Sequence, residues 1–223
     1  MTTGLPALAS TARTRLGRMR KRGTSDRAVL DDILAAGFLC HLGVVLDGHP
    51  MVVPTIYGAT ADTLYFHGSV ASPSLRDSPG TEVCVTVCHL DGIVLARSVF
   101  EHGINYRSAM IFGVPRTVTD PHEKLAGLRC VTEQVAPGQW GYARLPSRKE
   151  LAATTLLALS LAEASVKVRT GPPDDGDSPD ALAGRWAGVV PVRSVRGEPV
   201  PDPALPDTDL PVPDHIRALV DGG

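Results

Sequence analysis

The sequence predicts a mainly β protein with a few helices, in which antiparallel strands joined by short turns curl into a barrel. Three observations on the 223-residue chain support this fold class. Apolar and polar residues alternate over several runs of strand length, Asp-Gly pairs separate such runs at two places, and only a few segments show a helical period. Successive strands with short connections are typical of antiparallel sheets and barrels.

The chain begins with a basic arm and a helix. Residues 1–25 look irregular, and six Lys or Arg residues lie between Arg13 and Arg22. Such a cluster favours a solvated arm over a nucleic-acid or lipid contact. A helix is expected to begin at Ser25 or Asp26 and to end near the next glycine, with its apolar face formed by Leu30, Ile33 and Leu34.

The strands follow the first helix. Residues 38–58 form two apolar-rich arms around the Asp-Gly pair at 47–48, which tolerates the positive φ of a tight hairpin. Residues 81–98 repeat this arrangement around the pair at 91–92, so we expect a second hairpin there. Further strands are expected over residues 62–68 and 106–118.

A helix is expected near residue 120. Asp120 can cap it, Pro121 suits its first position, and Glu123 occupies the place of a capping-box acid. Its buried face is marked by Leu125, Leu128, Val131 and Val135. A second, short helix is expected over residues 147–154.

The last ordered elements are two strands, followed by a Pro-rich tail. Strict alternation points Val166 and Val168 inward, with Lys167 and Arg169 outward. After a loop rich in Gly, Pro and Asp, residues 185–193 form the final strand. The chain thus divides into an N-terminal arm (1–25), a barrel domain (26–195) and a tail (196–223).

Composition narrows the class of protein. Hydrophobic residues make up 43% of the chain, enough for one substantial core, and a net charge of −2 predicts no nucleic-acid or membrane partner. No apolar run approaches the ~20 residues of a membrane span, and the N-terminus lacks the apolar segment of a secretory signal. The four cysteines lie in apolar or amphipathic patterns that suit reduced thiols, so we expect a cytoplasmic protein.

The stretch TLYFHGSVASPSLR, residues 63–76, contains the parts of a phosphate site. Ser72 reads as the N-cap of a helix that starts at Pro73, and the first turn of a helix presents free backbone N–H groups to an anion. Ser69, Ser74 and Arg76 add hydroxyl and guanidinium donors. Serines also cap many helices that bind nothing, so the stretch alone leaves the site undecided.

Two other segments carry polar or open backbone groups. Asn105, Arg107 and Ser108 enter an otherwise apolar strand, where a strand-end salt bridge is the simpler alternative. Pro54 cannot donate to a sheet ladder, so its strand is expected at an edge or opened there. Open backbone groups suit the polar edge of a planar ring, and Trp186 could cover such a ring or serve as core filler.

Taken in order, DGHPMVVPTIY, LYFHGSVASPSLR, DGIVLARS, NYRSAMIFG, GPPDD and WAGVVP resemble the flavin-nucleotide-binding proteins of the pyridoxamine 5′-phosphate oxidase-related superfamily, close to the nitroimidazole-resistance proteins. The resemblance covers residues 18–203. It implies an FMN-binding split β-barrel of antiparallel Greek-key type, and a homodimer with FMN in two grooves at the subunit interface.

The resemblance also implies the residues that surround the FMN. The isoalloxazine ring would lie against a first group, which is Met51, Val52, Val53, Pro54 and Thr55. The ribityl chain and phosphate would lie against a second group, which is His67, Gly68, Ser69, Ser72 and Arg76. A third group would contribute from the neighbouring part of the interface, namely Asn105, Arg107 and Ser108, and Trp186 would close the groove. His67 and His102 are weak catalytic candidates, and no metal site is expected.

With FMN bound, the chain is expected to be an oxidoreductase that acts on a small molecule by hydride transfer through flavin N5, nitroreductases being one such class. The sequence has no G-x-G-x-x-G fingerprint, so NADH or NADPH would dock transiently. Three alternatives stay open: a non-catalytic flavin-storage protein, a deazaflavin-binding barrel, and a haem-binding barrel whose axial-ligand candidates are His41, His67, His89 and His102.

Two other sites are less favoured. Pyridoxamine-phosphate oxidation needs a basic pocket for a second phosphate, and Arg144, Arg148, Lys167 and Arg169 more simply form a solvated rim. Cys84, Cys88 and His89 are close in sequence, but a zinc site needs further ligands at a fitting spacing. Packed thiols are therefore the preferred interpretation.

Overall fold

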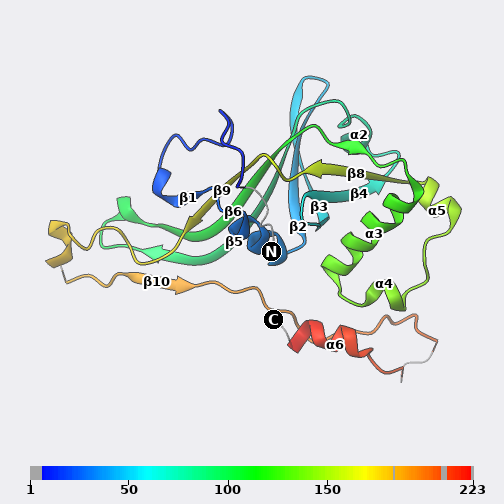
Figure 1. Cartoon of the computed structure of the whole chain (residues 1–223). Coiled ribbons are helices and arrows are strands. Elements are labelled where there is room, and N and C mark those ends of the chain that lie inside the picture. The colour runs from blue at the N-terminus through cyan, green and yellow to red at the C-terminus, as the bar shows by residue number, and fades with distance from the viewer. Residues whose placement is uncertain (1–6, 183, 207–209, 222–223) are drawn as a thin grey trace, which may run out of the picture.

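The computed structural model describes residues 7–182, 184–206 and 210–221. Its strands form one antiparallel sheet in the order β1-β9-β6-β5-β2-β3-β4-β8-β7, with β10 paired to β5 (Figure 1). The strands are β1 (Gly23–Thr24), β2 (Leu39–Leu46), β3 (His49–Ala59), β4 (Thr63–Ser69), β5 (Val83–Leu95), β6 (Gly103–Gly113), β7 (Arg116–Thr117), β8 (Thr154–Ser160), β9 (Ala164–Arg169) and β10 (Gly188–Pro191). The expected mainly β, curled antiparallel sheet is confirmed.

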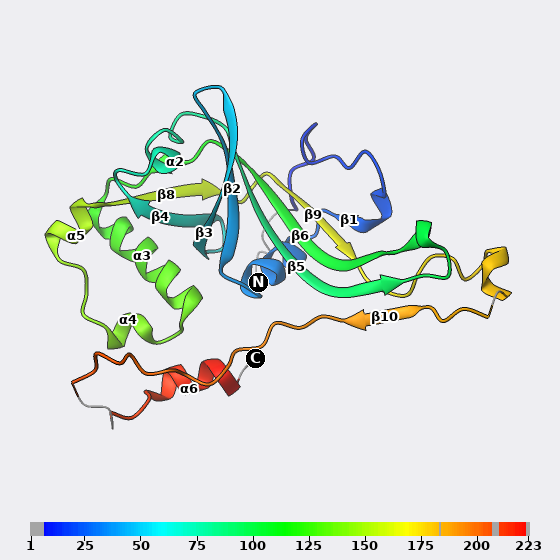
Figure 2. The same cartoon turned by 180° about the vertical axis from the view of Figure 1, so that it is seen from behind.

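Helices cover the sheet and carry the chain between strands. They are α1 (Arg27–Ala35), α2 (Pro73–Arg76), α3 (Pro121–Val135), α4 (Gln139–Tyr142), α5 (Arg148–Ala152) and α6 (Asp214–Asp221). Figure 2 shows α3, α4 and α5 together beside β4 and β8, while the β5–β6 ribbon extends to the opposite side. No helix among the described residues has the length and apolar character needed to cross a lipid bilayer.

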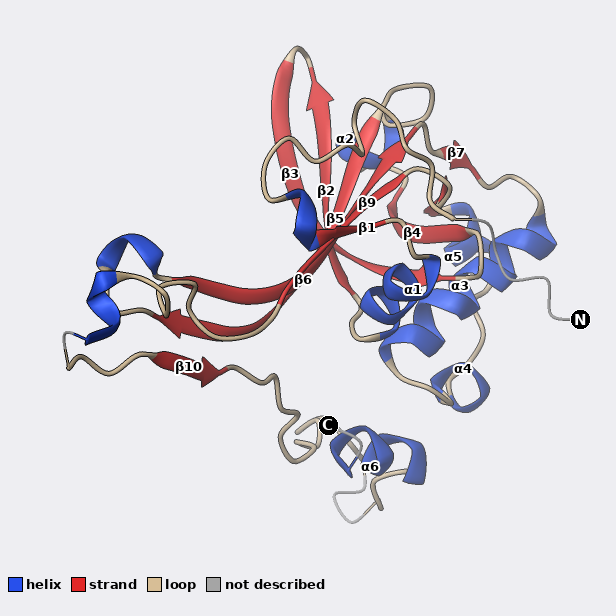
Figure 3. Cartoon of the chain, turned by 60° about the vertical axis from the view of Figure 1, so that its left-hand side comes forward, coloured by secondary structure: helices blue, strands red, loops and turns tan. Residues whose placement is uncertain are grey.

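The first helix and first hairpin form as expected. Asp26 caps α1 by accepting a hydrogen bond from the backbone N–H of Ala28, and the apolar face of the helix is buried. The turn between β2 and β3 has positive φ at both central residues, 50° at Asp47 and 78° at Gly48. Those values match a tight two-residue hairpin turn, and Figure 3 shows the hairpin projecting from the sheet.

The second predicted hairpin, at residues 91–92, is wrong. Strand β5 runs unbroken through this position, with a bulge where the register against β6 shifts between Leu90 and Gly92. Glycine is needed here because β10 approaches β5 closely: a Cβ at Gly92 would lie 2.9 Å from a methyl group of Val189 in β10. The carboxylate of Asp91 accepts two hydrogen bonds from Arg107 of β6, which ties the bulge to the neighbouring strand.

Two side chains depart from the expected pattern. Arg169 was expected outward but is only 8% exposed, and its guanidinium donates to the side chain of Asn105. Asp120 caps α3 as expected, yet Glu123 forms no capping box. Instead, Glu123 accepts hydrogen bonds from Arg116 and from the hydroxyl of Tyr65, because β7 and β4 present these donors beside the first turn of α3.

The core has two parts. The larger lies inside the curled sheet and contains Tyr57, Phe66, Leu42, Val85 and Ile111 among its fully buried side chains. The smaller lies between α3 and β8 and contains Val118, Leu128, Leu156 and Ala158. The two parts lie on opposite faces of the sheet, and the α3 side carries the cavity described below.

The arm and the tail both contact the sheet. Leu8 is buried in the main core, Arg13 pairs with Glu82 and Glu163, and β1 pairs with β9. The arm is thus held against the sheet, while five of its six clustered basic residues stay exposed, namely Arg13, Arg15, Arg18, Arg20 and Lys21. Strand β10 precedes the tail, and the tail carries α6, whose His215 donates a 2.8 Å hydrogen bond from Nε2 to Oε1 of Gln139. Residues 1–6, 207–209 and 222–223 of the expected arm and tail lie outside the described part.

Candidate functional site

The expected phosphate loop lies between β4 and α2. Strand β4 ends at Ser69 and α2 begins at Pro73, with Ser72 at the N-cap position, as the sequence predicts. The hydroxyl of Ser72 lies 3.1 Å from that of Ser74, and Ser69 accepts a hydrogen bond from the backbone of Ala71. The hydroxyl groups therefore gather at one end of β4, although α2 is only one turn long.

Arg76 belongs to this loop but already has a partner. Its guanidinium donates to both carboxylate oxygens of Asp77, at 2.7 and 2.8 Å. The pair is exposed, and Asp77 raises the pKa of Arg76 through this hydrogen bond. A phosphate at the loop would compete with Asp77 for the guanidinium.

Strand β3 has an open edge, as the position of Pro54 predicts. On one side β3 pairs with β2 from His49 to Ile56, but on the other side β4 pairs only with Tyr57, Gly58 and Ala59. The stretch from Met51 to Thr55 thus leaves one backbone edge without a neighbouring strand among the described residues. Val52 is 66% exposed, so this edge also presents apolar surface.

His67 lines a cavity of about 310 Å³ on the α3 side of the sheet. Its Nδ1 atom is buried and has no hydrogen-bond partner in the described part of the chain. Burial lowers the pKa of the imidazole, so the ring is neutral at pH 7. The walls of the cavity are mostly apolar, with Leu128, Trp140, Leu145 and Pro146, and polar groups include Thr132, Thr154, Arg144 and Glu150.

The pH dependence of folding should report the burial of His67. In the unfolded chain an imidazole takes up a proton below about pH 6.5, whereas the folded state resists it because the pKa is lowered. The unfolded state therefore binds more protons, and the free energy of unfolding should fall as the pH drops. Urea unfolding of the cofactor-free protein between pH 7.5 and 5 should show this loss, and His67→Gln should make it smaller. An unchanged pH profile in the variant would contradict the burial argument.

The expected residues of β6 lie apart from this group. The amide of Asn105 donates to the carbonyl of Gly171, Arg107 pairs with Asp91, and Ser108 donates weakly to the carbonyl of Lys167. In the sheet order, β5 and β2 separate β6 from β3. One chain therefore brings together the expected residues of β3, β4 and α2 but not those of β6. Trp186 is 69% exposed and packs over Gly188 ahead of β10, on the side of the β5–β6 ribbon.

The other histidine and cysteine candidates occupy ordinary structural positions. His89 contacts the carbonyl of Ile33 through Nε2, and His102 contacts the carbonyl of Ser98 through Nδ1, both at 2.9 Å. His41 is exposed on β2. All four cysteines are free thiols, and burial raises the pKa of Cys40 to about 12. Within the described ranges, no three His, Cys, Asp or Glu side chains converge as a metal site would require.

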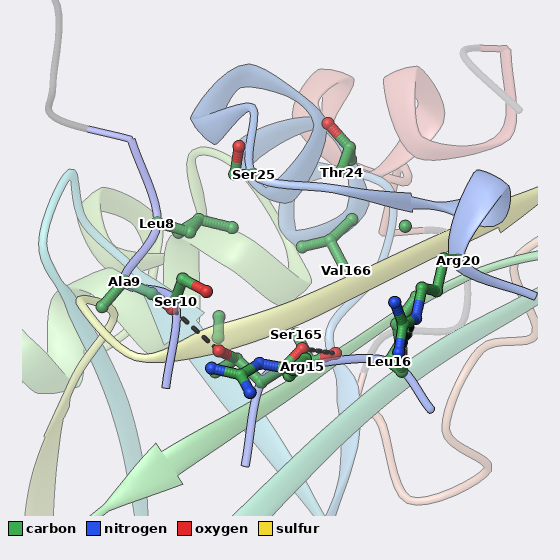
Figure 4. Close-up of a pocket in the computed structure, with 13 residues that line it drawn as sticks. Leu8, Ala9, Ser10, Arg15, Leu16, Arg20, Thr24, Ser25, Ser165 and Val166 are labelled. Atoms are coloured by element: carbon green, nitrogen blue, oxygen red, sulfur yellow. Dashed lines mark hydrogen bonds between the residues drawn. The ribbon is translucent and has the colours of Figure 1, made fainter. Parts of the chain in front are cut away.

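The N-terminal arm encloses a separate cavity of about 270 Å³ against β9 (Figure 4). The hydroxyl of Ser165 in β9 donates to the carbonyl of Thr14, and the hydroxyl of Thr14 donates to the carbonyl of Ala9. Arg20 donates to the carbonyl of Leu16 within the arm itself. The polar groups along this cavity thus hold the arm to the sheet.

Several residues of these sites were not predicted from the sequence. Trp140 and Leu145 reach the His67 cavity because α4 lies against α3 and the following loop leads back to α5 beside the sheet. Asp175 is 3% exposed and accepts hydrogen bonds from the backbone of Arg97 and Ser98, which fixes the loop after β9. The sequence around Trp140 and Leu145 indicates only local helix or loop structure and gives no sign of the cavity. For Asp175, the available signal was the cluster of acidic residues at 174–177.

Comparison with known proteins identifies the family. Residues 26–168 match the sequence profile of the pyridoxamine 5′-phosphate oxidase family. A search of curated proteins gave no match. Among solved structures, the flavocytochrome Anf3 from Azotobacter vinelandii is 38% identical, with a TM-score of 0.89 over 94% of this chain and 97% of that one. The FAD and haem binding protein from Mycobacterium smegmatis is 39% identical, with a TM-score of 0.85 over 89% and 97%.

A more distant structure agrees in fold alone. A candidate 5-nitroimidazole antibiotic resistance protein from Bacteroides thetaiotaomicron is 22% identical, with a TM-score of 0.55 over 66% of this chain and 86% of that one. The profile match covers well over half of the chain, and the two nearer structures cover almost all of it. The curled antiparallel sheet is accordingly the split barrel of this group, and the chain belongs to the pyridoxamine 5′-phosphate oxidase family.

Proposed function

We propose that this chain is a redox protein that binds both a flavin and a haem. The observation that carries the proposal is the similarity to two proteins that span almost the whole chain at 38% and 39% identity, a flavocytochrome and an FAD and haem binding protein. The resemblance of the sequence motifs alone implied FMN. The second relative makes FAD the better candidate for this chain.

The flavin is assigned to the open edge of β3 and the loop after β4. Backbone groups between Met51 and Thr55 would meet the polar edge of the ring, because no strand among the described residues uses that edge. The clustered hydroxyls of Ser69, Ser72 and Ser74 would face the phosphate, with Arg76 beside them. A bound flavin supplies hydride and electron transfer, while these residues hold and orient it.

The residues around His67 fit a haem. A neutral imidazole is the form that ligates iron, and His67 has a buried nitrogen without a hydrogen-bond partner in the described chain. Leu128, Trp140 and Leu145 give the cavity apolar walls, as the porphyrin faces require. Arg144, exposed at the rim, can shift from Glu150 to a propionate. Of the four histidine candidates, His67 therefore has the best environment.

The site is proposed to be completed by a second copy of the chain. Two strands, β5 and β2, lie between the expected flavin residues of β6 and those of β3, so one chain does not assemble the whole set. Large apolar side chains are exposed on the β2–β3 and β5–β6 ribbons, among them Val45, Val52, Ile93, Ile104 and Met110. Light scattering should give twice the mass of the chain; a monomer that holds its flavin would contradict a shared site.

Cofactor extraction tests the identity of the flavin. The protein as purified should release FAD and protohaem on denaturation, each in about one copy per chain, as measured by chromatography and mass spectrometry. Release of FMN alone would favour the expectation drawn from the motifs. Release of neither, together with failure to rebind FAD, FMN or a deazaflavin, would end the proposal.

Reduction of the bound flavin by a nicotinamide donor distinguishes an oxidoreductase from a flavin-storage protein. Under anaerobic conditions, NADH or NADPH should bleach the flavin of an oxidoreductase, and an electron acceptor should restore the colour over many turnovers. A storage protein would keep its flavin oxidised with either donor. Nitroaromatic compounds are the first acceptors to try, because of the fold shared with the resistance protein.

The affinity for flavin should respond to Arg76 and Asp77 in opposite directions. Arg76→Ala removes a guanidinium from the phosphate loop and should weaken flavin binding about tenfold, which corresponds to about 1.4 kcal/mol. Asp77→Ala frees the guanidinium from its carboxylate partner and should tighten binding. Fluorescence quenching on flavin titration measures both, with Arg129→Ala on α3 as the control. Equal affinities in all four proteins would remove Arg76 from the site.

A further inference from the structure

A basic cavity of about 510 Å³ lies between the arm and the far end of the β5–β6 ribbon. It is separate from the loop after β4 and from the His67 cavity. Arg18, Arg22 and Arg169 bring three guanidinium groups to it, and the carboxylates among its lining residues are Glu101 and Asp174. Its volume lies within the range of small-molecule sites.

The guanidinium of Arg169 is built into the wall of this cavity. Its side chain is 9% exposed, and its Nη1 atom donates to the carbonyl of Ile104 and to Asn105 Oδ1, at 3.3 and 3.0 Å. The nearest carboxylate oxygen, on Asp174, lies 3.9 Å from Nη2. A guanidinium has five N–H donors, so most of the donating capacity of Arg169 is left to the cavity in the described structure.

The charges of the cavity are poorly balanced. Asp174 is half exposed and is shared by Arg169 and Arg22, whose closest approach to it is 3.3 Å. A buried arginine without a close counter-ion is costly, because the charge has lost its hydration. A phosphate group would supply the missing negative charge and can accept paired hydrogen bonds from a guanidinium.

Two further features of the lining suit a nucleotide. Phe100, which is 85% exposed, and Tyr106 both border the cavity, and aromatic rings stack on bases. Met19 also borders it and has left-handed backbone angles, φ 55° and ψ 45°. This conformation is strained for a residue with a side chain, and such strain clusters at functional sites. Arg22, at the end of the same turn, donates to Asp174 in the loop after β9.

We propose that this cavity binds the pyrophosphate and adenine of a dinucleotide, with Arg18, Arg22 and Arg169 on the phosphates and Phe100 against the base. The dinucleotide is a nicotinamide donor that docks beside the flavin, whose own phosphate is assigned to the loop after β4, and the inference therefore rests on the proposed function. Asn105, to which Arg169 donates, is one of the β6 residues that the proposed second subunit would bring to the flavin.

The test uses ADP as the probe and calorimetric titration as the measurement. Full-length protein is prepared without flavin, loaded with FMN, and loaded with FAD. ADP should bind all three proteins, and adenosine should bind at least tenfold more weakly because it lacks the phosphates. If ADP no longer binds the FAD-loaded protein, the cavity holds the adenylate half of FAD, and the assignment to a free donor is overturned. If ADP still binds, the cavity serves a free dinucleotide.

Variants show whether ADP binds in this cavity. Arg18→Ala and Arg169→Gln should each weaken ADP binding at least tenfold, whereas Lys21→Ala, which removes a charge from the same turn outside the cavity, should not. Because Arg169 is buried, Arg18→Ala provides the measurement if the other variant does not fold. No ADP binding to the flavin-free protein, or binding unchanged in Arg18→Ala, would overturn the inference. A protein that binds ADP but no flavin would instead contradict the proposed function.

Discussion

The His67→Ala variant is expected to lose its haem entirely. The substitution removes the one imidazole whose buried nitrogen has no protein partner among the described residues, and it leaves the apolar walls of the cavity in place. Without an axial ligand, haem would be held by apolar contacts alone, so the variant should purify without a Soret band. Its flavin absorption should remain, since the flavin is assigned to β3 and the loop after β4.

The other histidine candidates provide matched controls. His41→Ala, His89→Ala and His102→Ala each remove one imidazole, from an exposed strand position or from a backbone contact. All three variants should keep the Soret band at full intensity relative to protein absorption. Loss of the band in one of them, with the band retained in His67→Ala, would assign the haem to another site.

The Gly58→Val variant is expected to be the most strongly destabilised of the substitutions considered. Gly58 lies where β3 passes under α3, and an added Cβ would lie 2.5 Å from the backbone nitrogen of Val131 and 2.6 Å from the carbonyl carbon of Cys130. Backbone atoms of a packed helix cannot move aside as a side chain can. The helix must shift as a whole, at a cost of about 3 kcal/mol in the free energy of unfolding.

Chemical denaturation of the flavin-free protein measures this loss. Gly141→Ala is the control, because no atom lies within 4 Å of a Cβ added there and the residue is in helix α4. It should stabilise the protein by up to about 1 kcal/mol, because alanine favours the helical backbone more than glycine does. A Gly58→Val protein as stable as the parent would show that α3 does not pack this closely on β3.

Local patterns predicted the parts of the fold that local chemistry determines. Asp47 and Gly48 form the expected tight turn because both adopt the positive φ that such a turn needs. Asp120 caps α3 because its carboxylate accepts from the first turn. Pro54 marked an open edge because a residue without an N–H cannot complete a ladder.

Tertiary contacts decided what the sequence could not predict. The Asp-Gly pair at 91–92 resembles a turn, yet β10 and β6 hold it inside a long strand. Arg169 follows an alternating pattern that points it outward, but Asn105 and the carbonyl of Ile104 bind it inside. The cavities form where α3, α4, the arm and the ribbon meet the sheet, and these segments are far apart in the sequence.

The absorption spectrum of the protein as purified tests the central claim, that one chain binds a flavin and a haem. The account predicts a Soret band together with the two broad bands of an oxidised flavin, and a shift of the Soret band when dithionite reduces the iron. A spectrum with flavin bands alone, unchanged after incubation with haemin, would contradict the assignment of His67. A protein that stays colourless after incubation with FAD, FMN and haemin would contradict the account as a whole.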